Sequence, residues 1–98
     1  MSLTMCVLLW ARPDADDALI AYEDRVLKLV PEHGGTVLNR ARSSGTDGQP
    51  LEIQLLAFPS AAALSDYMTD SRRLALADDR DRAVASTEVI NVEIIGPC

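Results

Sequence analysis

The apolar and polar positions of the chain fall into two successive strand-helix-strand units. The first unit opens with a dense apolar run over residues 3–11, which Arg12 and Pro13 end, because proline lacks a backbone donor and disfavours helix in the residue before it. Apolar side chains then recur every three or four residues, which predicts a helix that ends near Glu32. The residues of this apolar stripe are Leu19, Tyr22, Val26, Leu29 and Val30.

Polar residues mark both ends of this predicted helix. Asp14 or Asp16 is the expected N-cap, since a carboxylate there accepts a hydrogen bond from a free backbone N–H. The triplet His33-Gly34-Gly35 is the expected stop, because glycine readily adopts the left-handed conformation that ends helices.

The next segments predict a hairpin with a long loop. Residues 36–43 alternate between two faces, residues 44–50 are rich in turn formers, and residues 51–58 form a third strand. Pro59 ends this strand, and Ser60 is an expected helix N-cap.

The second helical segment leads into the last strand. Its periodic pattern breaks near residues 69–71 and resumes towards Val84, and residues 88–95 form the fourth strand. The expected fold class is α+β, a single domain over residues 1–98 with a four-stranded antiparallel sheet of ferredoxin-like βαββαβ topology and helices on one face.

Side-chain parity predicts which residues of each strand face the helices. Three alternate sets are wholly apolar and are expected on the helix side: Met5, Val7 and Leu9; Ile53, Leu55 and Ala57; Ile90, Val92 and Ile94. The opposite sets mix apolar and polar residues: Cys6, Leu8, Trp10 and Arg12; Glu52, Gln54, Leu56 and Phe58; Val89, Asn91, Glu93 and Ile95. A sheet face in contact with water is normally polar, so this mixed face is expected to be covered.

A second copy of the chain is the expected cover. Burial of each large apolar side chain contributes roughly 1.5 to 3 kcal/mol, against a total stability of about 5 to 15 kcal/mol. An isologous homodimer that places two mixed faces together would form a dimeric α+β barrel.

Composition and charge exclude several classes of function. The 98 residues carry a net charge of -6, which disfavours nucleic acid as a partner. Cys6 and Cys98 lie too far apart to indicate a disulfide scaffold and are expected to be free thiols in a reducing cytoplasm. The early apolar run is too short to span a membrane, and no motif for a metal or a cofactor is present in the sequence.

Several segments together resemble the DUF1330 family of the dimeric α+β barrel superfamily. They are His33-Gly34-Gly35, Phe58-Pro59-Ser60, Tyr67, Arg80 with Ala83 and Ser86, and residues 90–95. The resemblance covers nearly the whole chain. It implies a homodimer with a cleft between sheet and helices, and it matches Arg40 and Tyr67 to family positions that carry arginine and an aromatic residue.

Two residues are candidates for catalysis. His33 has an ordinary pKa near neutrality and is the natural general acid or base, although its place before two glycines also suits a helix C-terminus. Arg40 could hold an anionic oxygen through its fork of donors. Alternatively, Arg40 and Arg42 pair with Glu52 across the hairpin.

Four residues are candidates for substrate binding. Trp10, Gln54 and Asn91 are expected on one face as a polar and aromatic lining for a small organic molecule, and Tyr67 lies on an apolar helical stripe. The alternative for all four is an interface or core role. The arginines of residues 72–82 alternate with aspartates, which predicts a helix exposed to water.

Two functions remain open from the sequence. The first is an enzyme similar to cofactor-independent monooxygenases or small isomerases, in which His33 would move a proton, Arg40 would hold an anionic oxygen and Trp10 would shape the pocket. The second is a non-catalytic binding or dimerisation module. Fold likeness alone does not decide between them.

Overall fold

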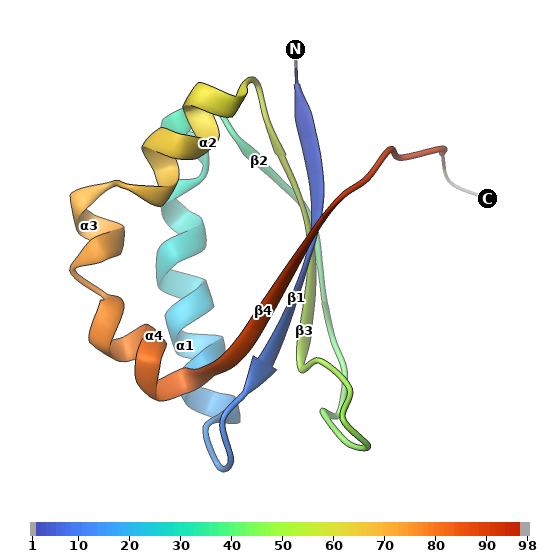
Figure 1. Ribbon diagram of the computed structural model, residues 1–98, viewed down its shortest axis with the longest axis vertical. Helices are drawn as coiled ribbons and strands as arrows, with labels where there is room; N and C mark the ends of the chain where they lie inside the picture. Colours follow the sequence, from blue (N-terminus) through green and yellow to red (C-terminus); the bar gives the residue numbers. More distant parts are fainter. Residues whose placement is uncertain (1, 97–98) are drawn as a thin grey trace.

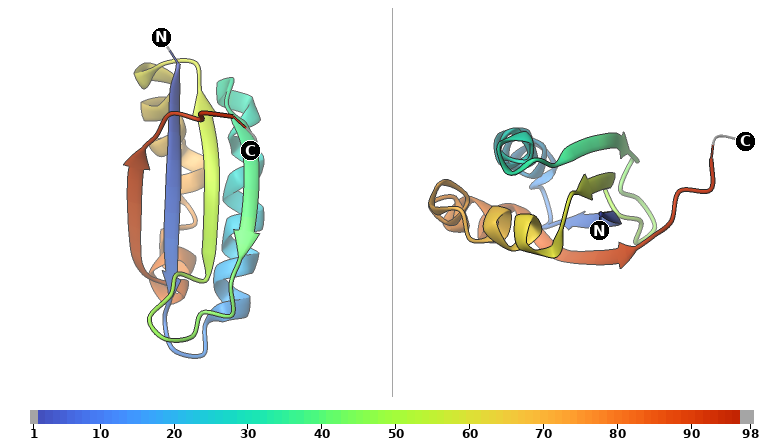
Figure 2. Two further views of the ribbon diagram at one scale, coloured as in Figure 1. Left: turned by 90° about the vertical axis from the view of Figure 1, so that its right-hand side faces the viewer. Right: turned by 90° about the horizontal axis from the view of Figure 1, so that it is seen from above.

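A four-stranded sheet is covered on one face by helices in the computed structural model, which describes residues 2–96 (Figures 1 and 2). The strands are β1 (Leu3–Ala11), β2 (Thr36–Arg42), β3 (Glu52–Phe58) and β4 (Val84–Asn91). The α-helices are α1 (Asp16–Val26), α2 (Ala61–Met68), α3 (Ser71–Leu74) and α4 (Ala77–Ala83), and two 3-10 turns, η1 (Leu27–Leu29) and η2 (Pro31–His33), follow α1.

The sheet order is β2-β3-β1-β4, and all three pairings are antiparallel. Together with the helix crossovers, this order confirms the predicted α+β fold of ferredoxin-like βαββαβ topology. The two helical segments lie side by side on the same face of the sheet (Figure 2).

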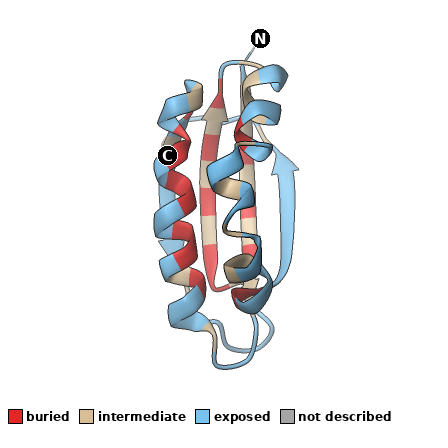
Figure 3. Cartoon of the chain, turned by 90° about the vertical axis from the view of Figure 1, so that its left-hand side faces the viewer, coloured by how far each residue is buried: buried red, intermediate tan, exposed pale blue. Residues whose placement is uncertain are grey.

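The core lies between the helix layer and the two central strands. Leu19, Tyr22 and Val26 on α1 are almost fully buried, and their side of the helix faces the sheet (Figure 3). On the sheet they meet the alternate residues Met5, Val7 and Leu9 of β1, as the parity of that strand predicts. No helix within residues 2–96 is both long enough and apolar enough to cross a bilayer.

The predicted helix ends are partly confirmed. Ser60 caps α2, since its Oγ accepts a hydrogen bond from the backbone N–H of Ala63 at 3.1 Å. The prediction that Asp14 or Asp16 caps α1 is wrong: Ala15 occupies that position and no side chain caps the helix, because Asp14 turns the chain with a φ of 60°.

Tight packing at the end of the first helical segment explains the glycine pair. Gly34 ends η2 in the left-handed conformation, with a φ of 74°. A Cβ at Gly35 would lie 2.7 Å from Cγ1 of Val30 and 2.8 Å from Cε1 of Phe58, so the backbone there lies directly against the core.

The strand registers overturn the predicted faces of β3 and β4. Val7 of β1 pairs with Gln54 of β3 and with Val89 of β4, and paired residues share a face of the sheet. The helix side of β3 therefore carries the set predicted for the opposite side, Glu52, Gln54, Leu56 and Phe58. The prediction failed because both faces of β3 are rich in apolar residues and the buried face holds two polar ones.

The last strand begins earlier than predicted. β4 starts at Val84, directly after α4, and ends at Asn91, whereas residues 88–95 were expected. The backbone N–H of Val92 still donates to the carbonyl of Thr4. β4 thus leaves the helix layer without a loop, which is why no turn signal marks its start in the sequence.

The sheet face turned away from the helices is mainly apolar. We call it the open face. Thr4, Ser86 and Glu88 are polar residues on this side, and its apolar residues on the central strands and β4 are Cys6, Leu8, Trp10, Ile53, Leu55, Ala57 and Ile90. Only Ile90 among these is a strongly exposed large residue, at 45%, and the others are half-buried by their neighbours. The thiol of Cys6 is free, and Cys98 lies outside the described residues.

Candidate functional site

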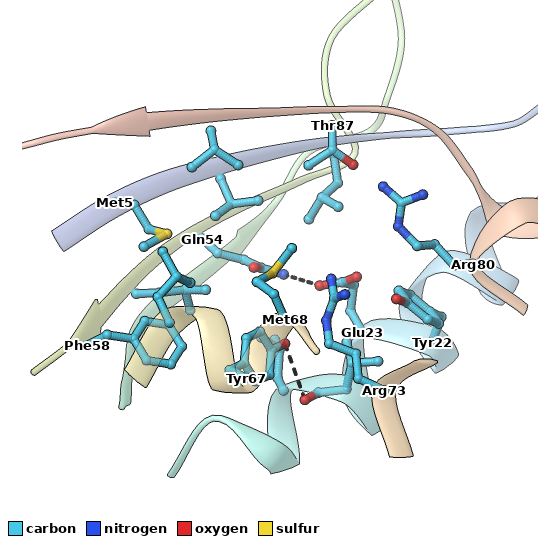
Figure 4. Close-up of a pocket in the computed structure, with 17 residues that line it drawn as sticks. Met5, Tyr22, Glu23, Gln54, Phe58, Tyr67, Met68, Arg73, Arg80 and Thr87 are labelled. Atoms are coloured by element: carbon cyan, nitrogen blue, oxygen red, sulfur yellow. Dashed lines mark hydrogen bonds between the residues drawn. The ribbon is translucent and has the colours of Figure 1, made fainter. Parts of the chain in front are cut away.

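A pocket of about 110 Å³ lies between the helix side of the sheet and the helix layer (Figure 4). Its apolar lining comes mainly from Met5, Val7, Leu56, Phe58, Leu64 and Met68. Its polar lining comes from Tyr22, Glu23, Gln54, Tyr67, Arg73, Arg80 and Thr87. A mainly apolar cavity with a few convergent polar groups is the usual form of a small-molecule site.

Glu23 is the acidic side chain of this pocket. It is 5% exposed, and its Oε1 accepts a hydrogen bond from Nε2 of Gln54 at 2.7 Å. Burial raises the pKa of Glu23, and Gln54 opposes this only in part. A carboxylate whose pKa is raised towards neutrality is a better proton acceptor than an exposed one.

Two tyrosines stand beside Glu23. Tyr67 packs against the ring of Phe58, with 5.4 Å between ring centroids, and its hydroxyl donates to the carbonyl of Val26 at 3.4 Å. Burial raises the pKa of Tyr67 and of Tyr22. Both phenols therefore remain protonated near neutral pH, and the hydroxyl of Tyr67 already uses its proton in the hydrogen bond to Val26.

Arg73 and Arg80 bring positive charge to the pocket from α3 and α4. The guanidinium of Arg73 lies over the ring of Tyr67, 5.2 Å from its centroid. Its Nε is buried and has no hydrogen-bond partner. The prediction that these helical arginines simply face water is therefore wrong for Arg73 and Arg80, whereas Arg72 and Arg82 form the expected exposed ion pairs.

Arg40 is not among the residues that line the pocket, and it forms ion pairs with Glu52 and Asp24. Its Nε and Nη2 donate to the two oxygens of Glu52, and Nη1 donates to Asp24 of α1. Burial alone would raise the pKa of Glu52, but hydrogen bonds from Arg40 and Gln54 lower it below its ordinary value. The pairing alternative for Arg40 and Arg42 is thus what the structure shows.

His33 lies at the end of η2 and is not itself a lining residue, but its ring packs edge-on against that of Tyr67, with 6.2 Å between the ring centroids. Its Nε2 is 2.8 Å from Oδ2 of Asp70, and Asp70 also binds Arg72, which in turn binds Glu32. These hydrogen bonds from Arg72 and His33 hold the pKa of Asp70 well below its usual range. The network ties η2 to the start of α3.

The predicted substrate-binding residues are only partly brought together. Gln54 and Tyr67 both line the pocket. Trp10 lies on the open face, where its Nε1 donates to the carbonyl of Gly48, so the expectation that it shares a face with Gln54 is wrong. Asn91 is exposed at the end of β4, opposite Met5.

Five polar residues of the pocket were missed: Tyr22, which was predicted as part of the core, and Glu23, Arg73, Arg80 and Thr87. One sequence signal could have found Glu23, which lies four residues after Leu19 and three before Val26 and so falls on the buried stripe. Arg80 has a similar spacing, four residues after Leu76 and three before the buried Ala83, but the many charges around it favour an exposed helix. Within residues 2–96, no three His, Cys, Asp or Glu side chains cluster as a metal site.

Comparisons with known proteins support the fold alone. No family model matches the chain, and no curated protein matches it. Among solved structures, a protein of unknown function from Rhodopseudomonas palustris is 20% identical, with a TM-score of 0.78 over 98% of this chain and 84% of that one. These values describe a shared fold without a shared activity.

Two further structures have the same architecture. A dimeric protein of unknown function with a ferredoxin-like fold from Bacteroides fragilis is 11% identical, with a TM-score of 0.69 over 95% of this chain and 96% of that one. A candidate antibiotic biosynthesis monooxygenase from Bacteroides thetaiotaomicron is 18% identical, with a TM-score of 0.71 over 98% of this chain and 91% of that one.

Proposed function

We propose that the protein is a homodimer that binds a small organic molecule in the pocket and transfers a proton on it through Glu23. The observation that carries this proposal is the position of Glu23, a buried carboxylate with a raised pKa in a cavity that also holds two phenols and two guanidinium groups. Such convergence of perturbed titratable groups is typical of catalytic sites.

The proton transfer needs a carbonyl compound as its substrate. Glu23 would take a proton from the carbon beside the carbonyl, which leaves an enolate and a neutral carboxylic acid. The guanidinium groups of Arg73 and Arg80 can stabilise the enolate oxygen, since both line the same pocket as Glu23. In a β,γ-unsaturated carbonyl compound the enolate is conjugated with the double bond, so Glu23 can return the proton to the γ-carbon, and the double bond then moves next to the carbonyl without a cofactor.

The open face supports the homodimer. Its apolar residues lie on the central strands, where contact with water is unfavourable, and a second copy offers an equal surface. The likeness to the dimeric Bacteroides fragilis protein agrees with this arrangement. Membership of the DUF1330 family, a cytoplasmic location and the catalytic roles of His33 and Arg40 stay predictions from the sequence.

Exchange of hydrogen for deuterium tests the proton transfer. In deuterated buffer, the protein should speed α-hydrogen exchange of 2-pentanone or 4-oxopentanoate, followed by proton NMR, and Glu23→Gln should reduce this rate at least 100-fold. Glu32→Gln is the matched control, because Glu32 is an exposed carboxylate outside the pocket lining.

A non-catalytic binding module is the competing function. It is supported by the hydrogen bond that Gln54 already donates to the Glu23 carboxylate. Ligand binding without accelerated exchange, or equal exchange in the wild type and Glu23→Gln, would favour that module over the enzyme.

A further inference from the structure

The arginines of this acidic chain differ in what they bind. Most of them pair with carboxylates, and these are Arg25, Arg40, Arg42, Arg72 and Arg82. Arg12 donates to the carbonyl of Asp81. Among the residues described, 2–96, Arg73 and Arg80 form no ion pair with a carboxylate.

Both of these arginines line the same pocket. Each is half-buried, and the buried Nε of Arg73 lacks an acceptor, although buried donors are nearly always satisfied in proteins. Glu23 is the sole acidic side chain among the lining residues described, and burial favours its neutral form. The pocket therefore carries an excess of positive charge in a protein whose net charge is -6.

The pocket also has two chemically different ends. Met5 and Phe58 lie at one end, whereas Arg73, Arg80 and Tyr22 lie together at the other, with Gln54 and Glu23 between them (Figure 4). A ligand that fits both ends has an apolar body and one anionic group.

We propose that the ligand of this pocket is a small monocarboxylate with an apolar body, whose carboxylate lies between Arg73 and Arg80. A guanidinium matches a carboxylate through two parallel hydrogen bonds, and the Nε of Arg73 would gain the acceptor it lacks. Glu23 would then lie beside those carbon atoms of the ligand that are next to its bound carboxylate. This inference rests on the proposed function only for the reaction, because carboxylate binding needs no proton transfer.

Paired ligands isolate the contribution of the charge. Titration calorimetry with hexanoate and phenylacetate, each against its uncharged amide, should show at least tenfold tighter binding of the carboxylate, as one charged hydrogen bond provides. Arg73→Gln and Arg80→Gln should each remove most of that preference. Arg82→Gln is the matched control, since Arg82 lies on α4 but outside this pocket.

The wild type supplies a second readout that does not depend on the variants folding. The Nε–H resonance of Arg73 in nitrogen-15 spectra should shift on addition of the carboxylate and stay unchanged with the amide. Equal affinity for carboxylate and amide, an unmoved Arg73 resonance, or tighter binding of inorganic phosphate would each overturn the inference. Carboxylate binding without α-hydrogen exchange would instead overturn only the proposed reaction.

Discussion

Arg40 binds Glu52 through two hydrogen bonds, from Nε to Oε2 at 2.8 Å and from Nη2 to Oε1 at 3.0 Å. The Glu52 side chain is 1% exposed and that of Arg40 is 29% exposed, so the ion pair lies at the boundary between the core and the solvent. Gln54 donates to the same carboxylate at 2.7 Å and thereby connects the pair to the pocket.

Arg40→Ala should lower the free energy of unfolding by about 2 to 4 kcal/mol at pH 7, because it leaves the buried Glu52 without its main partner. Arg42→Ala is the control and should cost less than about 1 kcal/mol, since its single contact is long and its side chain is 45% exposed. Urea unfolding measures both. The lowered pKa of Glu52 implies stabilisation above about pH 4.3 that fades as the pH falls further, so the difference should shrink in acid.

Glu23→Gln should make the protein more stable near neutral pH. The pKa of Glu23 is raised in the folded state, so its charged form opposes folding increasingly as the pH rises above the unfolded value of about 4.3. Glutamine avoids this charge and can still accept the hydrogen bond from Gln54. The gain in Tm should be absent near pH 4, grow as the pH rises above that value, and become constant once Glu23 is charged in both the folded and the unfolded state. A gain that did not depend on pH would contradict the raised pKa.

Leu8→Glu should convert the proposed homodimer into monomers. Leu8 lies at the centre of the open face and pairs with Glu88 of β4. A second carboxylate there would lie beside a like charge in the interface, and an apolar contact worth roughly 1.5 to 3 kcal/mol per copy is lost. Leu74→Glu on α3 is the control, because Leu74 is 55% exposed on the helix layer. Light scattering after gel filtration gives the mass. A wild type that is monomeric at micromolar concentration would refute the dimer.

His33→Ala should lower Tm and leave α-hydrogen exchange within about twofold of the wild type. The ring of His33 binds Asp70 and lies outside the pocket lining, so its loss weakens the connection between η2 and α3 without touching the bound molecule. Thermal unfolding and the exchange assay give the two values. An unchanged Tm with abolished exchange would support instead the catalytic role predicted for His33 from the sequence.

The sequence predicted the order of the elements well and the faces of two strands badly. Local signals such as Ser60 and the pair Gly34-Gly35 depend on neighbours in the chain, so they could be recognised directly. The faces of β3 depend on which residues pair with β1 across the sheet. Because Glu52 and Gln54 are polar yet buried, the hydrophobic rule assigned them to the wrong side.

The candidate site was only partly predictable for a related reason. Gln54 and Tyr67 were identified, but Gln54 was grouped with Trp10, which lies on the open face. Arg73 differs from Arg72 only in the direction of its side chain around α3. Such a difference comes from tertiary packing and leaves no trace in the order of charges along the chain.

β1 contributes to both surfaces of the sheet, with Met5 and Val7 lining the pocket and Cys6 and Leu8 on the open face. The proposed ligand and the proposed partner subunit would therefore lie on opposite sides of the same strand, β1. If the ligand alters the twist of β1, it must change the dimer dissociation constant, and thermodynamic reciprocity then requires assembly to change ligand affinity by the same factor. Dilution would in that case act on this protein as an allosteric effector.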